Sequence, residues 1–534
     1  MDSMLRGSLP AKIGYAFRRA WQGSALNRFF HAVGANYEKS KTRRVLHRFL
    51  SVPSTLVYSR YYRVLNAVNG WFFRIGERLR PAIAGSAVFR ACTRLTHSAF
   101  VENSAVLRTI RNLGMRGILI IAFGMYLPLD VLIRDVVGID LLSSVWDEVF
   151  MLFCIGYIIW DMIVIQRERR KPRATPLDAP VLFFMGAGLL VMAVVSPQMS
   201  IAIAGYRAVC QFMLWFFVLT RLISGNRELR IFYYSICVMA VGVALHGIYQ
   251  YIVGVEIPKN WVAVAEMGVR TRVFSITGSP NIMGALMVMC APMVAALIYY
   301  VKPLWLKCVM WGGTLACCLA ALFTFSRGAW LGLAVAILLF GLIVDRKILL
   351  LALVAAGGLL LFVPEISNRI AFLFTSDFVE ANQAGGRAQR WSMGRMLLST
   401  NPVFGYGLGR FGGAIAMQNQ VVDGLNYFYM DNYYMKTLVE MGYVGLISYL
   451  YLLASNLLFT VRGLFKTRKD RMSILSRGMF CGMMGVLTHS FFENIFEVPY
   501  MNAYFWGMAA AIMFISYLRR KNAAERTQPA KEGR

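Results

Sequence analysis

The most regular feature of the sequence is a series of long apolar stretches that recur between Gly117 and Leu518. They lie near residues 117–133, 148–165, 179–195, 203–222, 231–250, 282–300, 304–325, 329–344, 347–363, 433–460, 472–489 and 500–518. Lipid offers backbone N–H and C=O groups no hydrogen-bond partners, so a chain crosses the hydrocarbon core as a helix of about 20 apolar residues. The pattern therefore predicts an all-α, polytopic transmembrane helix bundle with about 12 spans.

The charged residues lie mainly between the apolar stretches. Every second connection is rich in Lys and Arg, as is the tail from Arg519 onward; examples are 167–171, 346–347 and 468–469. Positive residues accumulate on the cytoplasmic side of a membrane, so these connections and both termini are expected to be cytoplasmic. The long loop 364–432 then lies outside. Its many aromatic residues predict a partly helical segment packed on the bundle, with function on that face.

Residues 1–116 precede the first apolar stretch and carry twenty Lys or Arg against four Asp or Glu. Segments 16–30 and 56–75 place apolar residues on one face and Arg on the rest, which is typical of helices that lie on an anionic membrane surface. A partly disordered basic arm is the alternative. The chain is thus divided into a basic cytoplasmic region 1–116, a membrane domain 117–518 and a basic cytoplasmic tail 519–534.

Composition narrows the class of protein further. The 58% of hydrophobic and 16% of charged residues are typical of a membrane protein that is surrounded mainly by lipid. The formal net charge of +29 is spread over connections and tails and not along one basic face, so no nucleic acid partner is expected. Eight of the nine cysteines fall in predicted spans, which argues against a disulfide framework. Cys317 and Cys318 lack the spacing of metal ligands, and no metal site is expected.

Positive residues on the outer side need a reason other than topology, and nearly all of them here are arginines. They are Arg270, Arg272, Arg327, Arg369, Arg387, Arg390, Arg395 and Arg410. The planar guanidinium group stays charged and binds phosphate oxygens in bidentate fashion. The cluster therefore predicts a lipid-linked phosphate or diphosphate ligand. Pairing with Asp377, Glu380 and Asp423, or with lipid headgroups, is the alternative.

Three local patterns refine this prediction. Arg387 and Arg390 are three residues apart and share one face of a helix, with Arg395 within reach. Residues 401–410 combine a helix stop with a glycine-rich turn, which lets the backbone approach a ligand closely. Arg327 lies in a short turn between two apolar stretches. An ionisable side chain at that membrane boundary indicates function, with helix capping or snorkelling as the alternative.

The start of the tenth predicted span carries the candidate general base. Asp431 has no partner at helical spacing and lies beside the arginine-rich loop, so its carboxylate is the predicted proton acceptor. N-capping of the tenth helix is an alternative and compatible role. Asn432, Lys436 and Glu440 form one helical stripe, and a Lys436–Glu440 pair is expected inside the bundle. Two residues near the outer end of the next span are expected to line the same pocket: His489 and Glu493. A place in the core or a helix cap is the alternative for His489.

Taken in order, these patterns resemble the O-antigen ligase and polysaccharide polymerase family of bacterial membrane glycosyltransferases. The resemblance covers about residues 200–518 and rests on four motifs: Arg272–Asn281, Ser326–Gly332, Arg387–Phe411 and Asp431–Gly445. It implies that a glycan is taken from undecaprenyl diphosphate at the outer face of the cytoplasmic membrane, with the diphosphate held by Arg272, Arg327, Arg387 and Arg390. Asp431 is then the catalytic residue, and further substrate contacts are expected from Arg270, Asn281, Arg410, Asn432, Glu440, His489 and Glu493.

The resemblance also implies which partners the protein has. No nucleotide, metal or other cofactor is expected, because the lipid diphosphate already activates the anomeric carbon. The expected partners are the undecaprenyl-diphosphate-linked glycan, an acceptor glycan or lipid, membrane lipids and polysaccharide-assembly proteins.

One departure from the family pattern bears on the reaction. Where ligases commonly carry a His-Asn pair, this chain has Asp431-Asn432, which favours a polysaccharide polymerase. The alternatives are a ligase to lipid A core, a protein O-oligosaccharyltransferase, a transporter or flippase, and a non-enzymatic assembly scaffold. A transporter is less favoured because the sequence shows no internal repeat and its polar residues gather on one face.

Overall fold

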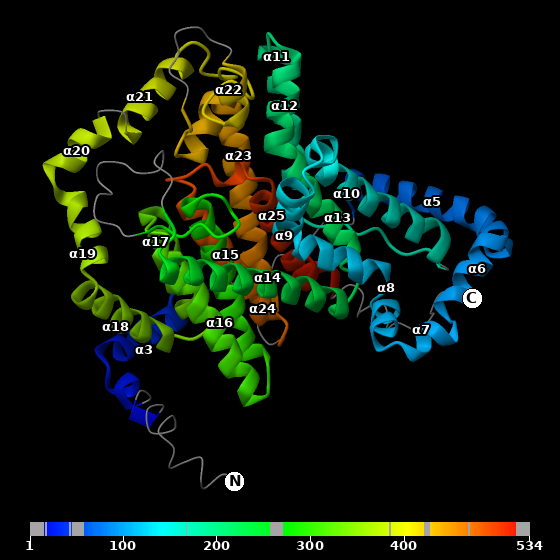
Figure 1. Ribbon diagram of the computed structural model, residues 1–534, viewed down its shortest axis with the longest axis horizontal. Coiled ribbons are helices and arrows are strands. Elements are labelled where there is room, and N and C mark those ends of the chain that lie inside the picture. Colours follow the sequence, from blue (N-terminus) through cyan, green and yellow to red (C-terminus); the bar gives the residue numbers. More distant parts are fainter. Residues whose placement is uncertain are drawn as a thin grey trace. The chain divides into compact units, whose positions relative to one another are not determined.

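The computed structural model describes residues 15–16, 19–41, 44, 48, 58–166, 168–256, 271–383, 386–420, 428–467 and 470–519. These residues form helices joined by short connections, without a β-strand among them (Figure 1). The chain divides into two compact units, residues 1–53 with 337–373 and residues 54–336 with 374–534. The all-α fold expected from the apolar pattern is confirmed.

Eight helical segments of the described chain are long and apolar enough to cross a membrane. They are α10 with η3 (Asp140–Ile165), α11 (Asp178–Val195), α12 to α13 (Met199–Leu222), α14 (Asn226–Val253), α15 (Pro280–Tyr300), α16 (Leu304–Phe323), α23 (Tyr433–Lys466) and α25 with η9 (Pro499–Leu518). Each corresponds to a predicted span. The protein is therefore a multi-pass membrane protein.

The predicted number of about 12 spans is not confirmed, because the other four apolar stretches fold differently. Two of them are bent pairs: α8 (Ala105–Gly124) with Tyr126–Val137 turns by 77°, and α18 (Lys347–Phe362) with Pro364–Phe374 turns by 90°. Counting each bent pair as one span gives ten. The remaining two are helices of 17 residues, α17 (Arg327–Ile343) and α24 (Ser473–His489).

The smaller unit contains α3 (Ala25–Lys39), the end of α17, α18 and α19 (Pro364–Ala371). Pro364 opens α19 after the extended residue Val363, and a proline is tolerated there because the first turn of a helix needs no N–H partner. The Arg346 guanidinium lies 5.1 Å from the centre of the Phe30 ring, which joins α3 to the turn before α18.

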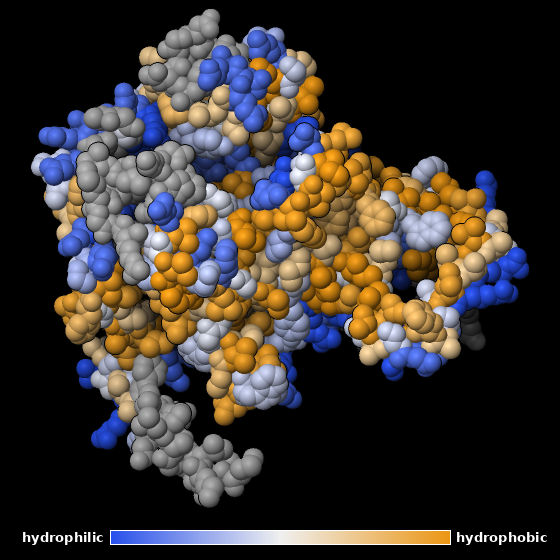
Figure 2. Space-filling model, in the orientation of Figure 1, coloured by the Kyte–Doolittle hydropathy of each residue, from blue (hydrophilic) through white to orange (hydrophobic). Residues whose placement is uncertain are grey.

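The larger unit is built around α15 and α25, each with 94% of its apolar window buried. Both helices are hydrophobic all round, which is the pattern of a helix enclosed by others. Gly482 of α24 lets that helix approach the backbone of Met289 in α15. By contrast only 11% of the α10 window is buried. Figure 2 shows broad hydrophobic surface over the α9–α13 region labelled in Figure 1, as expected for helices that face lipid.

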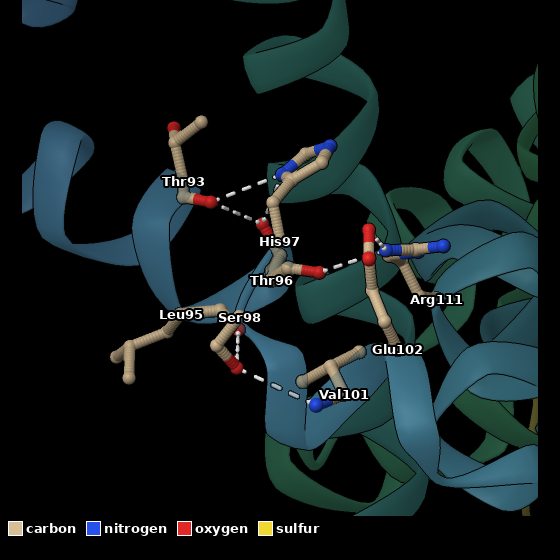
Figure 3. A network of polar contacts seen from close by, with 8 residues as sticks. All are labelled: Thr93, Leu95, Thr96, His97, Ser98, Val101, Glu102 and Arg111. Atoms are coloured by element: carbon tan, nitrogen blue, oxygen red, sulfur yellow. Dashed lines mark hydrogen bonds and ion pairs between the residues drawn. The ribbon is translucent and has the colours of Figure 1, made fainter.

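The predicted amino-terminal region is helical wherever the structure describes it from residue 58 onward. Its helices are α5 (Arg60–Gly85), α6 (Ala87–Thr96), α7 (Ala99–Asn103) and the first half of α8. Each begins after a serine whose hydroxyl accepts a backbone N–H, the caps being Ser59, Ser86, Ser98 and Ser104. Figure 3 shows how α6, α7 and α8 are joined: Arg111 donates to Glu102 (3.4 Å) and to the Thr96 carbonyl (3.3 Å).

Candidate functional site

The site is organised by a break in helix α23. At Gly442 the backbone takes φ 63° and ψ −162°, which interrupts the helical hydrogen bonds on both sides. The glycine-rich loop 401–413 satisfies two released carbonyls and two released N–H groups. Its bonds are Tyr406 N to Val439 O (2.7 Å), Gly407 N to Glu440 O (3.0 Å), Tyr443 N to Pro402 O (2.9 Å) and Val444 N to Val403 O (3.1 Å).

Glycine is required where the loop and the broken helix meet. Gly405 has φ 79° and Gly442 has φ 63°, a region that L-residues rarely adopt. A Cβ on Gly405 would overlap the Gly442 nitrogen, and a Cβ on Gly442 would overlap the Val403 carbonyl. The glycine-rich turn therefore brings two backbone segments together, and that contact accounts for Gly405.

The predicted Lys436–Glu440 pair is present inside the bundle. The Lys436 Nζ and Glu440 Oε2 atoms are 2.8 Å apart, and both side chains are buried. The other carboxylate oxygen of Glu440 accepts the backbone N–H of Gly409 (3.0 Å) and of Phe411 (3.4 Å). Glu440 thus fastens the loop to α23. This arrangement favours a structural role for Glu440 over direct contact with a substrate.

Asp431 lies just before α23 and is held by two arginines of α21 (Arg387–Leu398). The Arg390 Nη1 atom is 2.8 Å from Asp431 Oδ2, and the Arg387 Nε atom is 3.7 Å from the same oxygen. The two arginines lie on one helical face, as their spacing predicted. Arg387 also donates to the Phe492 carbonyl (3.2 Å) and Arg390 to the Tyr429 carbonyl (3.3 Å).

The N-cap of α23 is Asn432 and not Asp431, so the capping role considered for Asp431 is wrong. The Asn432 side-chain oxygen accepts the N–H of Met435 at 2.9 Å, and Asn432 is buried. An N-cap residue needs extended backbone, which Asn432 has with φ −164° and ψ 108°. Asp431 therefore lies outside the helix, and its carboxylate contacts Arg387 and Arg390.

A second carboxylate, Glu493, reaches the same cluster from the loop after α24. Its side chain accepts a hydrogen bond from the amide of Asn281 (2.5 Å), whose oxygen in turn accepts from Arg272 (3.3 Å). The Arg272 Nε atom also donates to the Thr324 carbonyl at 3.0 Å. Arg272, Asn281 and Glu493 therefore form one chain of contacts across segments that are far apart in sequence.

The pKa of Glu493 is raised to about 7. Burial is the largest cause, and the negative charge of Asp431 adds to it. Hydrogen bonds from the Asn494 backbone and the Asn281 amide act in the opposite direction, as does the charge of Arg387. Glu493 therefore changes charge near neutral pH beside Asp431.

The Ser326-Arg327-Gly328 turn packs against the end of α24. A Cβ on Gly328 would lie 2.7 Å from the His489 ring and 3.0 Å from Phe492, so only glycine fits. His489 is buried, and its Nδ1 atom has no hydrogen-bond partner among the described residues. The Arg327 guanidinium lies 5.3 Å from the centre of the Phe378 ring. Arg327 and His489 thus adjoin the segment that supplies Phe492 and Glu493.

One predicted site residue, Arg410, stands apart from this cluster. The Arg410 guanidinium lies 4.6 Å from the centre of the Tyr406 ring and donates to the Tyr406 carbonyl at 3.2 Å, within its own loop. Arg270 lies outside the residues that the structure describes. The site therefore centres on Asp431 and Glu493 with Arg272, Arg387 and Arg390.

Glu497 is not among the site residues predicted from the sequence. Its carboxylate accepts the Ala414 N–H (2.7 Å) and a hydrogen bond from the Asn494 amide, so it ties the loop after α24 to α22 (Ala414–Asn419). The one available signal was its spacing of four residues from Glu493, which is too common to identify a partner. Across the described residues, no group of three or more His, Cys, Asp or Glu side chains could hold a metal ion.

The fold and this site define a multi-pass membrane protein with paired arginines and carboxylates beside a broken helix. Residues 312–450 match the family model described as O-antigen ligase, which confirms the family expected from the motifs. The matched segment contains Arg327, Arg387, Arg390 and Asp431, whereas Arg272, Asn281 and Glu493 lie outside it. A comparison with curated proteins finds no significant match. The match supports an O-antigen ligase or polymerase type of membrane enzyme in polysaccharide biosynthesis and implies a glycosyltransferase-like activity.

The backbone conformation at the break in α23 predicts that one added methyl group at Gly442 lowers the stability of the protein. Gly442→Ala is expected to destabilise the protein by about 1–3 kcal/mol, because it forces an L-residue into a strained conformation against the Val403 carbonyl. The thermal unfolding midpoint in detergent measures this. Gly186→Ala is the control, since Gly186 in α11 has open space around its Cβ position. Equal midpoints for the two variants would contradict the structural role of the break.

The raised pKa of Glu493 predicts a pH-dependent stability. A carboxyl group with a higher pKa in the folded state binds more protons there, so its stabilising contribution is present below about pH 4.5 and is lost as pH rises through about 7. Glu493→Gln should therefore gain stability relative to wild type between pH 5 and pH 8, measured by unfolding midpoints at both values. Glu380→Gln, at an exposed position on α20 (Ser376–Gln383), should show no such gain. A constant difference between wild type and Glu493→Gln would refute the shift.

Proposed function

We propose that this protein transfers or polymerises glycan units from a polyprenyl diphosphate such as undecaprenyl diphosphate. The reaction takes place at the outer face of a bacterial plasma membrane, with both termini in the cytoplasm. The observation that carries the proposal is the contact of Asp431 with Arg387 and Arg390, which joins a proton acceptor to two phosphate-binding groups. The family match over residues 312–450 supports the same class of reaction.

The donor diphosphate is bound by the guanidinium groups. Arg387 and Arg390 come from one turn of α21, so their side chains converge on one oxyanion, and the contacts of Arg272 bring it to the same cluster. In the absence of donor, Asp431 balances the positive charge of the arginine pair. A diphosphate carries more negative charge than one carboxylate, so it competes for the same guanidinium groups and releases Asp431.

Asp431 then acts as general base on the acceptor. Its carboxylate takes the proton of the acceptor hydroxyl while that oxygen forms a bond to the anomeric carbon of the donor glycan. The bond from the anomeric carbon to the diphosphate oxygen breaks, and the diphosphate leaves with the electron pair. The arginines stabilise the negative charge that develops on this leaving group, so their effect is largest in the transition state.

Loss of the base should stop the reaction without removing the protein. Asp431→Asn keeps the shape of the side chain but cannot accept the proton, and glycan transfer should fall by about 100-fold or more. The measurement is the amount and length of surface polysaccharide in cells that carry only the variant, with the membrane level of the protein checked in parallel. Asp377→Asn, at an exposed carboxylate on α20, should leave the product unchanged. Normal polymer from Asp431→Asn would refute the assignment.

The arginine pair should be sensitive to side-chain geometry as well as charge. Arg390→Ala is expected to lower kcat/KM for the lipid-linked donor by about 100-fold, and Arg390→Lys should recover little because an ammonium group cannot bind phosphate in bidentate fashion. The same expectation holds for Arg387. Arg395→Ala removes an exposed arginine from the same helix and should retain activity. If Arg395→Ala lost as much as Arg390→Ala, only the overall charge of α21 would matter.

A further inference from the structure

A cavity of about 1340 Å³ lies at the other end of the larger unit. Its walls come from α5, α10 (Asp140–Trp160), η3 (Asp161–Ile165), α13 (Leu214–Leu222) and the connection 166–173, with Leu518 of η9 (Phe514–Leu518) at its edge. Leu518 ends the helix that begins at Pro499, shortly after Glu493, and 20 helical residues span about 30 Å. The cavity is therefore a separate place from the Asp431 cluster.

The lining of this cavity combines an apolar half and a charged half, as a binding site for an amphiphilic ligand does. One half is apolar, formed by side chains that include Ile155, Ile158, Ile159, Leu214 and Phe217. The other half is strongly basic, with six cationic side chains against the carboxylates of Asp161 and Glu168: Arg116, Arg169, Arg170, Lys171, Arg173 and Arg221. The excess of positive charge beside an apolar wall suits a ligand with an anionic head and a hydrocarbon body.

Two of the basic side chains, Arg116 and Arg173, hold the walls of the cavity in place. Arg116 pairs with Asp161 at 2.6 Å. Arg173 donates to the carbonyls of Thr220 (2.9 Å) and Ile223 (2.8 Å), which caps the end of α13. The carbonyl groups carry no formal charge, so the bonds of Arg173 fix its position without forming an ion pair. These residues hold the rim of the cavity in place and keep it positive.

Two arginines at the mouth are exposed. Arg169 donates to the backbone and side-chain oxygens of Asn66 on α5, at 3.0 and 3.1 Å, and so joins the connection to that helix. The Arg170 backbone carbonyl accepts a hydrogen bond from Asn69 on α5, and its side chain donates to no residue that the structure describes. The Arg170 guanidinium is therefore free to bind an anion at the edge of the apolar wall.

We propose that this cavity binds one anionic phospholipid, with the headgroup phosphate on Arg169 and Arg170 and the acyl chains along the isoleucine and phenylalanine wall. A free phosphate would use only the basic half and leave the apolar half exposed to water, which is unfavourable. The basic connection 166–173 is one that the positive-inside rule assigns to the cytoplasmic side, where anionic lipids attract Lys and Arg. The lipid bridges α5 and the membrane-spanning helices.

Lipid binding to the purified full-length protein tests the proposal. Native mass spectrometry in detergent, with phosphatidylglycerol or phosphatidylcholine added at equal concentration, should show one phosphatidylglycerol retained and phosphatidylcholine bound at least about ten-fold more weakly. The double variant Arg169→Gln/Arg170→Gln should weaken phosphatidylglycerol binding by about ten-fold or more. The control Arg74→Gln/Arg78→Gln removes two exposed charges from α5 that do not line the cavity, and should bind as wild type does.

A third variant tests the cavity without changing its charge. Val68→Trp places a larger side chain in the lining and should also displace the lipid, while its unfolding midpoint in lipid-free detergent stays near that of wild type. The proposal is overturned by any of three results: equal losses in the two double-arginine variants, equal binding of both lipids, or displacement of phosphatidylglycerol by an equal concentration of inorganic phosphate. The first would indicate general surface charge, and the last a soluble anion.

Discussion

The hydrogen bonds between the glycine-rich loop and the break in α23 are the constraint on which the site depends. A helix interrupted inside a membrane protein leaves backbone groups without partners, and each of these costs free energy unless another segment supplies the missing bonds. Here the loop does so at Val439 and Glu440, and it also binds the chain just before α23, because the Met430 N–H donates to the Gly412 carbonyl at 3.0 Å. The loop therefore contacts the chain on both sides of the first half of α23.

The position of Asp431 follows from this arrangement. The residue lies between Met430, which the loop holds, and Tyr433, whose N–H donates to the Ser490 carbonyl at 2.9 Å. The same Ser490 precedes the segment that carries Phe492 and Glu493. The Asp431 and Glu493 segments therefore lie together because a backbone hydrogen bond joins them, and Arg387 reaches both through its side-chain contacts with Asp431 and the Phe492 carbonyl. The buried Lys436–Glu440 pair holds the loop in register with the helix.

The sequence located eight spans correctly but predicted neither the number of spans nor the two bends, for a physical reason. Hydropathy over a window measures how much lipid a segment tolerates, so it located α14, α15 and α25. It carries no information on angles, and the bends of 77° and 90° were missed. In the same way, helical spacing predicted that Arg387 and Arg390 share a face, but Asp431 lies 41 residues from Arg390. Such a contact depends on tertiary packing, as does the choice of Asn432 over Asp431 as the N-cap.

The charge balance of the site suggests how donor binding and chemistry are linked in the proposed reaction. Without donor, the Asp431 carboxylate is held on Arg390 and is occupied by that contact. A diphosphate that binds the arginines in its place releases Asp431 and brings further negative charge close by. Asp431 can then contact the acceptor hydroxyl at the step in which its proton is removed. Glu493, with its pKa near 7, can take up a proton at the same moment and so limit the repulsion. In the proposed reaction, binding of the donor is therefore the event that makes the Asp431 carboxylate available to the acceptor.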